Sequence, residues 1–211
     1  MECVTSIDYH RNKGCKNMGQ IRAFIAVEIA NKKLIHAISK LQEKLKGIIG
    51  QLKLVELENL HITLRFLGDI SEKAAKRIYT YLEDNINPNY FEDGPIEFTV
   101  QKLSDFSKRV FHLGLQGPVS VLREIHEQID DELVKKFGFE NDRKFKSHLT
   151  IARARKNRNR QSSIQFPIDK YDKLKKEFED SVVLGTFRVA KVYLKRSVLT
   201  PNGPIYSNIE F

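Results

Sequence analysis

The stretches NLHITLRF (residues 59–66) and KSHLTI (residues 146–151) decide the fold, because each places a His-x-Thr motif within alternating polar and apolar residues. A period of two predicts a half-buried strand, whose successive side chains point to opposite faces. The histidine and the threonine of each stretch therefore share one face of a strand, and the apolar residues between them share the other. We expect the apolar faces to be buried and the polar faces to be accessible.

Two such strands, brought side by side, would place two imidazoles and two hydroxyls in one cleft. His61 and His148 suggest acid–base chemistry, because one histidine can accept a proton near neutral pH while another gives one up. The hydroxyls of Thr63 and Thr150 can donate hydrogen bonds to an oxyanion. A simpler interpretation stays open, in which these are ordinary polar positions on two strands. We expect no metal, since no Cys, Asp or Glu stands at ligand spacing beside either histidine.

These motifs resemble those of the two-histidine (2H) phosphoesterase superfamily, and within it the RNA 2′,3′-cyclic phosphodiesterases, historically called LigT or 2′-5′ RNA ligases. The resemblance rests on RAFIAVE (22–28), NLHITLRFLG (59–68) and SHLTIAR (147–153), and it covers about residues 21–211. One position departs from the usual sequence pattern of the family, because Ser147 stands where proline is expected. The resemblance implies an α+β fold that is bilobed and pseudo-symmetric, with two antiparallel sheets facing a central cleft and helices outside.

The resemblance also implies a reaction, the hydrolysis of a terminal 2′,3′-cyclic phosphate of RNA to a 2′-phosphomonoester. By resemblance His61 is the proton donor and His148 the proton acceptor, although the spacing of the motifs does not distinguish these roles. Thr63, Thr150 and Arg153 are expected to hold the phosphate oxygens. Strict alternation puts Arg153 on the face opposite Thr150, so its role requires a strand end or a β-bulge. A weak reverse reaction, which joins RNA ends through a 2′-5′ bond, is an expected companion.

The order of predicted elements is similar on both sides of about residue 92, where a strand, a helix and a histidine strand follow one another. Ser71 is expected to cap a helix, Gly138 to end the strongest helical pattern, and residues 85–95 to form a loop rich in breakers. The repetition favours two α+β lobes across a cleft, each a small antiparallel sheet with helices outside.

Residues 1–20 are expected to be an N-terminal extension, and residues 21–211 a single bilobed domain. The extension has no sustained periodicity and no apolar segment typical of a secretory signal, and Met18 offers an alternative start of translation. Both cysteines, Cys3 and Cys15, lie in it, so the fold is expected to lack disulfides, as suits a reducing cytoplasm. No apolar run approaches the length of a membrane span, so we expect no membrane partner.

Charge narrows the choice of ligand. The formal net charge is +9, and eight Lys or Arg residues but no acidic residue lie between Arg143 and Ile168. Such a run is often only a solvated loop, but beside a proton-transfer site it would attract phosphate. The candidate RNA contacts are Arg65, in phase with His61 and Thr63, the aromatic ring of Phe24, and Arg155, Lys156 and Arg158 of the basic loop.

We expect an RNA end, for example that of a tRNA fragment, as the substrate of a cytoplasmic monomer that needs no cofactor. Two other functions stay open. A non-catalytic RNA-binding module would use the basic loop without both histidines, and a hydrolase of small cyclic or 2′-linked nucleotides would use the same site. A nucleotide-dependent enzyme is disfavoured, because the sequence has no Gly-x-x-x-x-Gly-Lys-Ser/Thr loop and no Gly-x-Gly-x-x-Gly after a strand.

Overall fold

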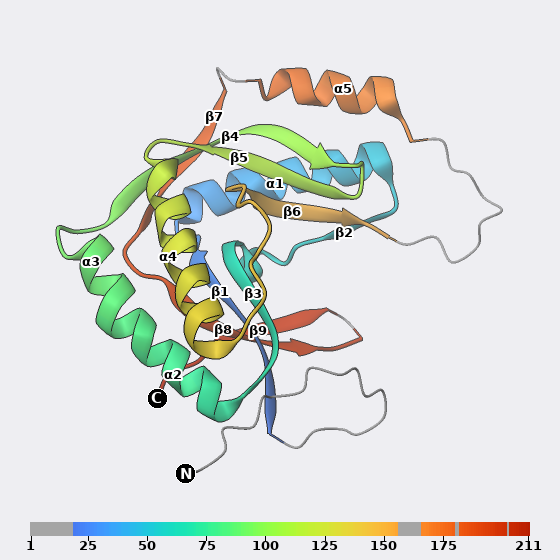
Figure 1. Cartoon of the computed structure of the whole chain (residues 1–211). Helices are drawn as coiled ribbons and strands as arrows, with labels where there is room; N and C mark the ends of the chain where they lie inside the picture. Colours follow the sequence, from blue (N-terminus) through green and yellow to red (C-terminus); the bar gives the residue numbers. More distant parts are fainter. Residues whose placement is uncertain (1–18, 156–165, 180–181, 202) are drawn as a thin grey trace, which may run out of the picture.

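Two antiparallel sheets form the frame of the molecule in a computed structural model that describes residues 19–155, 166–179, 182–201 and 203–211 (Figure 1). The first sheet has the order β3-β1-β8-β9, and the second has the order β2-β6-β5-β4-β7. The strands of the first sheet are β1 (Gln20–Glu28), β3 (His61–Ser71), β8 (Tyr193–Leu199) and β9 (Pro204–Asn208). Those of the second are β2 (Leu52–Leu54), β4 (Ile96–Phe106), β5 (Val110–Gln116), β6 (Leu149–Ala154) and β7 (Val183–Val189).

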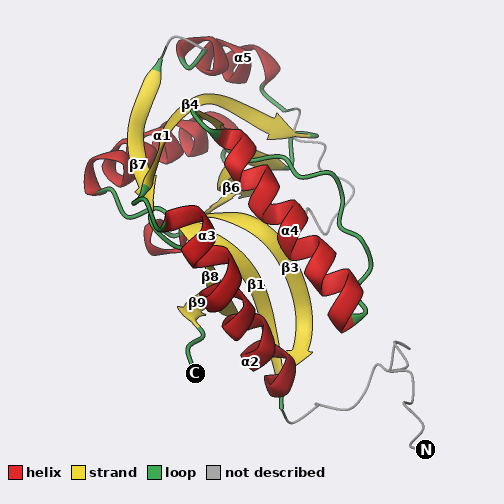
Figure 2. Cartoon of the chain, turned by 60° about the vertical axis from the view of Figure 1, so that its left-hand side comes forward, coloured by secondary structure: helices red, strands yellow, loops and turns green. Residues whose placement is uncertain are grey.

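Helices cover the outer faces of both sheets (Figure 2). They are α1 (Lys32–Ile49), α2 (Glu72–Tyr81), α3 (Asn87–Phe91), α4 (Val119–Phe137) and α5 (Ile168–Glu177). The helices α2 and α4 contact strands of the first sheet, whereas α1 contacts β6 and β7 of the second sheet and packs against α5. The α+β class with two antiparallel sheets and outer helices is thus confirmed.

Each of the two long helices packs on the sheet that does not contain the strand before it. The helix α1 follows β1 of the first sheet in sequence but packs on the second sheet, and α4 follows β5 of the second sheet but packs on β3 of the first. The point near residue 92 where the pattern repeats therefore does not divide the chain into two sheets. One continuous cluster of buried apolar residues joins both sheets and their helices, with members such as Ile25, Leu34, Ile62, Phe98 and Leu149.

Local signals place the helix ends. Ser71 caps α2 as expected, because its Oγ accepts a hydrogen bond from the N–H of Ala74 at 3.2 Å. Gly138 ends α4, also as expected, with a φ of 70° that glycine adopts without steric cost. At the start of α1, Asn31 Oδ1 accepts from the N–H groups of Lys33 and Leu34 at 3.0 and 3.1 Å.

The loop predicted for residues 85–95 is largely wrong. Leu82–Ile86 form a π-helical turn that continues α2, and α3 follows directly. The side chain of Asn87 accepts from the N–H of Val192 at 2.8 Å and donates to its carbonyl at 3.2 Å. This contact between distant parts of the chain holds a segment whose composition resembles that of a loop.

The expected domain boundary at residue 21 lies one residue inside β1, which begins at Gln20. Cys3 and Cys15 lie outside the described residues. Within the described part of the chain, no helix has both the length and the apolar character that a membrane span needs.

Candidate active site

A groove of about 940 Å³ lies between the two sheets and brings the two His-x-Thr motifs together. Its walls come from β1, β3 and β9 on one side and from β2, β6 and the segment before β6 on the other. His61, Thr63, His148 and Thr150 all line it. The two strands thus supply two imidazoles and two hydroxyls to one space.

Both histidines are held by the same type of hydrogen bond. Nδ1 of His61 donates to the carbonyl of Asn59 at 2.7 Å, and Nδ1 of His148 donates to the carbonyl of Lys146 at 2.7 Å. Because a carbonyl can only accept, Nδ1 carries the proton in each ring. Nε2 is therefore the atom of each imidazole that can gain or lose a proton.

His61 lies in a largely buried aromatic corner of the groove. Its ring centroid is 4.9 Å from that of Phe24 and 5.3 Å from that of Tyr206. Its Nε2 lies 3.0 Å from Oγ1 of Thr63, which donates to the unprotonated nitrogen. Burial lowers the pKa of His61 to about 4, with smaller contributions from the charges of Lys195 and Arg153, while the Asn59 carbonyl opposes the shift.

His148 has different neighbours. Its ring centroid lies 5.1 Å from that of Phe106 and 5.3 Å from that of a third imidazole, His112. Burial, followed by repulsion from His148, lowers the pKa of His112 to about 4. Within the described residues neither ring nitrogen of His112 has a hydrogen-bond partner. The sequence did not reveal His112 or Phe106, because only the pairing of His112 with Thr150 across β5 and β6 brings this ring near the motif.

A β-bulge follows each motif. On β3, Thr63 pairs with Ala26 and Arg65 with Ile25, which leaves Leu64 as the extra residue. On β6, Thr150 pairs with His112 and Ala152 with Phe111, which leaves Ile151 as the extra residue. An extra residue inverts the alternation of side chains for the rest of a strand.

The bulge at Ile151 turns Arg153 into the groove on the same side as Thr150. The expected phosphate-binding role of Arg153 requires such a β-bulge. The bulge at Leu64 has the same effect on β3, where it turns Phe66 toward the groove and leaves its ring 64% exposed. Phe66 thus has the place in the first motif that Arg153 has in the second.

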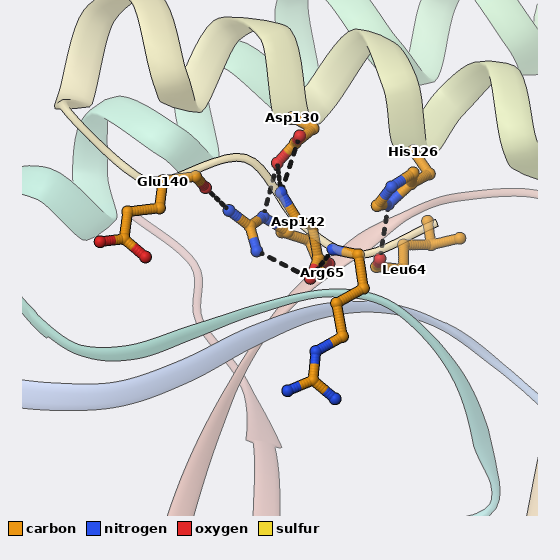
Figure 3. Close-up of polar contacts among 7 residues, drawn as sticks. Leu64, Arg65, His126, Asp130, Glu140 and Asp142 are labelled. Carbon is orange, nitrogen blue, oxygen red and sulfur yellow. Dashed lines mark hydrogen bonds and ion pairs between the residues drawn. The ribbon is translucent and has the colours of Figure 1, made fainter. Parts of the chain in front are cut away.

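The prediction that Arg65 shares a face with His61 and Thr63 is wrong, because the bulge lies between Thr63 and Arg65. Arg65 is only 7% exposed and points toward α4 (Figure 3). Its Nε lies 2.9 Å from Asp130 Oδ1 and its Nη1 lies 3.2 Å from Asp142 Oδ1, and Nη2 donates to the carbonyl of Glu140. The Nε–H is not aligned for a hydrogen bond, so the contact with Asp130 is an ion pair.

A buried side chain from a crossing helix holds the backbone at each bulge. His126 of α4 donates from Nδ1 to the carbonyl of Leu64 at 2.9 Å (Figure 3). Gln42 of α1 donates from Nε2 to the carbonyl of Ile151 at 2.8 Å. Both carbonyls belong to the extra residue of a bulge, and both donors are at most 5% exposed. The irregular backbone beside each motif is therefore hydrogen-bonded in the interior.

The other predicted RNA contacts have separate outcomes. Phe24 lines the groove beside His61. Arg155 follows β6 with an exposed side chain outside the groove lining, and its N–H donates to the carbonyl of Gln51 at 3.1 Å. Lys156 and Arg158 lie outside the described residues.

Besides Arg153, the groove contains charged residues that were not assigned a role from the sequence. The cationic ones are Arg22, Lys53, Arg143, Lys144 and Lys146, and the carboxylates are Glu56 and Asp142. Arg22 could have been found, since alternation places it on the same face of the first strand as Phe24. Lys53 could not, because its place depends on the pairing of β2 with β6, where it lies opposite Arg153.

Similarity to known proteins identifies the family to which this chain belongs. Residues 23–209 match the family described as the AKAP7 2′5′ RNA ligase-like domain. The chain belongs to the two-histidine phosphoesterase family. Two relatives of this two-histidine phosphoesterase, each named RNA 2′,3′-cyclic phosphodiesterase, are 36% identical to it. The one from Methanothermobacter thermautotrophicus aligns over 90% of this chain and 97% of its own length, and the one from Methanocaldococcus jannaschii over 90% and 99%.

Solved structures share the fold of this phosphoesterase. A protein of Thermus thermophilus matches with a TM-score of 0.64 and 24% identity over 90% of this chain and 96% of its own. The LigT protein of E. coli, solved in complex with 3′-AMP, matches with a TM-score of 0.62 and 18% identity over 92% and 96%.

Proposed function

We propose that this two-histidine phosphoesterase is an RNA 2′,3′-cyclic phosphodiesterase, which hydrolyses a terminal 2′,3′-cyclic phosphate to a 2′-phosphomonoester. The proposal rests above all on the matched pair of histidines, since a carbonyl holds Nδ1 of each ring and leaves Nε2 to exchange protons in one cationic groove. The names of the relatives that are 36% identical support the same activity.

The reaction needs one proton acceptor and one proton donor. Nε2 of His148 takes a proton from a water molecule, whose oxygen attacks phosphorus as the bond from phosphorus to the ribose 3′ oxygen breaks. Nε2 of His61 gives its proton to that leaving oxygen. The product carries a 2′-phosphate and a free 3′-hydroxyl, and the two histidines return to their starting states by exchange with solvent.

The assignment of His61 as donor needs a charged imidazole, although burial lowers the pKa of this ring to about 4 in the free protein. The anionic cyclic phosphate provides the missing partner, because a negative charge close to the ring favours the imidazolium. We therefore expect His61 to gain its proton together with the substrate. The Thr63 hydroxyl then no longer donates to Nε2 and can donate to a phosphate oxygen.

Charge on the non-bridging oxygens increases in the transition state, and three side chains of the groove can stabilise it. Thr63 and Thr150 supply hydroxyl donors from the two strands, and Arg153 supplies a guanidinium that can bind two oxygens. The charge of Arg153 also contributes to lowering the pKa of both His61 and Tyr206, although burial is the larger effect on each and raises the pKa of Tyr206.

The rest of the RNA end fits the groove by its chemistry. Arg22 on one wall, and the lysine and arginine side chains gathered on the other wall, suit the phosphates of a single strand. The half-buried ring of Tyr206 and the exposed ring of Phe66 can stack on an unpaired base, whereas Phe24 is only 3% exposed and supports these rings from behind. We propose a tRNA fragment as one such substrate and a cytoplasmic monomer that acts without metal or cofactor.

A single experiment tests the activity. The purified protein is incubated, with EDTA present, with a short oligoribonucleotide that ends in a 2′,3′-cyclic phosphate, beside His61→Ala and His148→Ala variants. We expect the wild-type protein alone to open the ring, and mass spectrometry with a 2′-phosphate-specific digest to identify the product. Loss of activity in EDTA that zinc or magnesium restores would contradict the metal-free mechanism.

Two further functions have observable signatures. If neither wild type nor variants open the ring but all bind the RNA equally, the groove belongs to a binding module. If 2′,3′-cyclic mononucleotides are opened much faster than the oligoribonucleotide, the substrate is a small cyclic nucleotide. The weak 2′-5′ ligase activity has its own assay, in which the protein is incubated with an RNA that ends in the cyclic phosphate and a second RNA that has a 5′-hydroxyl end.

A further inference from the structure

We propose that Arg65 is a positioning residue of the reaction, which acts from the first histidine strand on the ring of the second histidine. The proposal rests on the function proposed above for the groove. Arg65 comes two residues after Thr63, yet its side chain leaves the groove and enters a cluster with α4 and the segment that leads to His148. It thus links the strand of the first His-x-Thr motif to the segment that leads to the second.

The segment concerned is 138–148, which connects α4 to β6 and contains no helix or strand. Its backbone therefore lacks the ladder of hydrogen bonds that fixes a strand, although it supplies Arg143, Lys144 and Lys146 to the groove. It also supplies the carbonyl of Lys146, which accepts the Nδ1 hydrogen bond of His148 at 2.7 Å. A shift of this carbonyl would turn the ring or change which nitrogen carries its proton.

Arg65 fixes the middle of this segment. The guanidinium pairs with the Asp142 carboxylate at 3.2 Å and donates to the Glu140 carbonyl, while Asp130 of α4 pairs with the guanidinium and accepts from the N–H of Asp142 at 3.1 Å. The side chains of Arg65, Asp130 and Asp142 are 9%, 14% and 28% exposed, so solvent screens these charges only weakly.

A second contact joins the same parts close to His148. The ring of Phe145 stacks on His126 with centroids 5.0 Å apart, and His126 donates to the carbonyl of Leu64, the residue before Arg65. Figure 3 shows both attachments on one stretch of β3, the Leu64 carbonyl toward His126 and the Arg65 side chain toward Asp130 and Asp142. The bulge thus provides two adjacent anchors for the segment.

Replacement of Arg65 should therefore disturb His148 more than the binding of RNA. Arg65→Met keeps much of the apolar stem but leaves the Asp130 and Asp142 carboxylates together without the guanidinium, so the segment is expected to move away from α4. We expect kcat to fall about 10-fold to 100-fold, the size of effect that follows from a misplaced catalytic group. KM should rise by a smaller factor than kcat falls, because Arg65 itself does not line the groove although the segment that it holds supplies Arg143, Lys144 and Lys146 to it.

The decisive measurement is the tautomer of His148, read from ¹⁵N chemical shifts of its imidazole at a pH where the ring is neutral. We expect the wild-type ring to carry its proton on Nδ1 and the Arg65→Met ring to populate both tautomers. Asp142→Asn, which keeps the Arg65–Asp130 pair, should produce a smaller change in the same direction. Arg188→Met serves as the control, since Arg188 pairs with Glu97 on an exposed face of the second sheet.

The outcomes separate this proposal from the proposed function. A folded Arg65→Met protein with the wild-type tautomer and the wild-type kcat would overturn the positioning role. If Arg65→Met does not fold, Asp142→Asn decides alone, and an unchanged tautomer and kcat in that variant would also overturn it. If the wild type lacks phosphodiesterase activity, the function fails, but the ¹⁵N comparison still shows whether Arg65 controls the ring.

Discussion

At the scale of the residue, the two catalytic rings of the proposed reaction differ in their surroundings although their hydrogen bonds match. His61 is surrounded by Phe24 and Tyr206 and is covered by the Thr63 hydroxyl, whereas His148 adjoins a second, uncharged imidazole. Pseudo-symmetry therefore extends to the backbone and the motifs but stops at the neighbouring side chains.

We expect His61 to titrate with a pKa near 4 in the free protein, because burial disfavours its charged form. Inorganic phosphate at saturation should raise that pKa, since an anion in the groove stabilises the imidazolium. ¹H–¹⁵N spectra of the imidazoles across pH 3.5–8, with the His61→Ala variant to assign the signal, would show both effects. A pKa that does not change with phosphate would contradict the assignment of His61 as the donor.

We expect Arg153→Met to lower kcat/KM about 10²-fold to 10³-fold, the usual effect of removing one donor that stabilises transition-state charge. Arg153→Lys should fall between this variant and the wild type, since lysine keeps the charge but lacks the fork that binds two oxygens. Arg155→Met is the matched control, because it removes the same charge two residues further on, outside the groove. Equal losses in both methionine variants would mean that only net charge matters.

The residues of the site show what alternation can and cannot predict. The shared faces of His61 with Thr63 and of His148 with Thr150 follow from a period of two and were predicted from the sequence. Beyond each threonine the same rule fails, since it places Arg65 in the groove and Arg153 outside it, the reverse of the structure. The resemblance to a known family, and not the alternation, predicted an arginine in the groove at position 153.

At the scale of the element, a hydrogen bond from a long helix to the strand lies at each bulge. The carbonyl of a buried extra residue needs a hydrogen-bond donor, because it would be costly to bury unbonded. His126 donates to the carbonyl of Leu64, whereas the carbonyl of Ile151 accepts from Gln42 and also from the N–H of Val55 at 2.9 Å. Gln42 also donates to the carbonyl of Val55 at 2.7 Å. Each crossing helix thus stabilises the local backbone that orients groove side chains.

We expect Gln42→Leu to lower the free energy of unfolding by about 1–3 kcal/mol, because it leaves buried carbonyls with fewer donors. It should also lower kcat/KM, since a relaxed bulge at Ile151 no longer holds Arg153 in the groove. Urea denaturation and the cyclic phosphate assay measure the two effects. Glu43→Leu, at an exposed position of the same helix, is the control and should change neither by much.

The elements that local signals define were predicted, and those that distant contacts define were not. Ser71 and Gly138 mark helix ends through their own chemistry, so the sequence locates them. The helical turns of residues 82–91 depend on Asn87 binding the backbone of Val192, far along the chain. The composition of that segment is typical of a loop, and only the fold supplies the partner.

At the scale of the whole molecule, two depressed histidine pKa values make stability depend on pH. His61 and His112 have pKa values of about 4 in the folded chain against 6.5 when unperturbed, so the unfolded state binds more protons between these values. The contribution of these two histidines to the free energy of unfolding is therefore fully present above about pH 6.5. It is lost as the pH drops to about 4, by at most about 3 kcal/mol for each histidine.

Urea denaturation at several pH values would measure this loss. We expect the double variant His61→Asn, His112→Phe to lose less stability than the wild type between pH 6.5 and 4. The hydrogen bonds of Lys108 and Tyr171 lower the pKa of Asp105 against the opposing effect of burial, so its stabilisation is also lost as the pH falls toward and below 3.8. Because both proteins contain Asp105, the comparison between them isolates the two histidines. Identical slopes in both proteins would assign the loss to other groups.

The exchange of α1 and α4 between the sheets is the large-scale feature that the sequence did not reveal. Helical periodicity shows that each helix has an apolar face but does not say which sheet receives it. This exchange limits how the two sheets can move relative to each other. A hinge needs two bodies joined by few connections, whereas here the chain passes from sheet to sheet repeatedly, and each long helix anchors the strands of the opposite side. We expect the walls of the groove to keep their separation, so that an RNA end enters a space already shaped for it and no lobe closure contributes to selectivity.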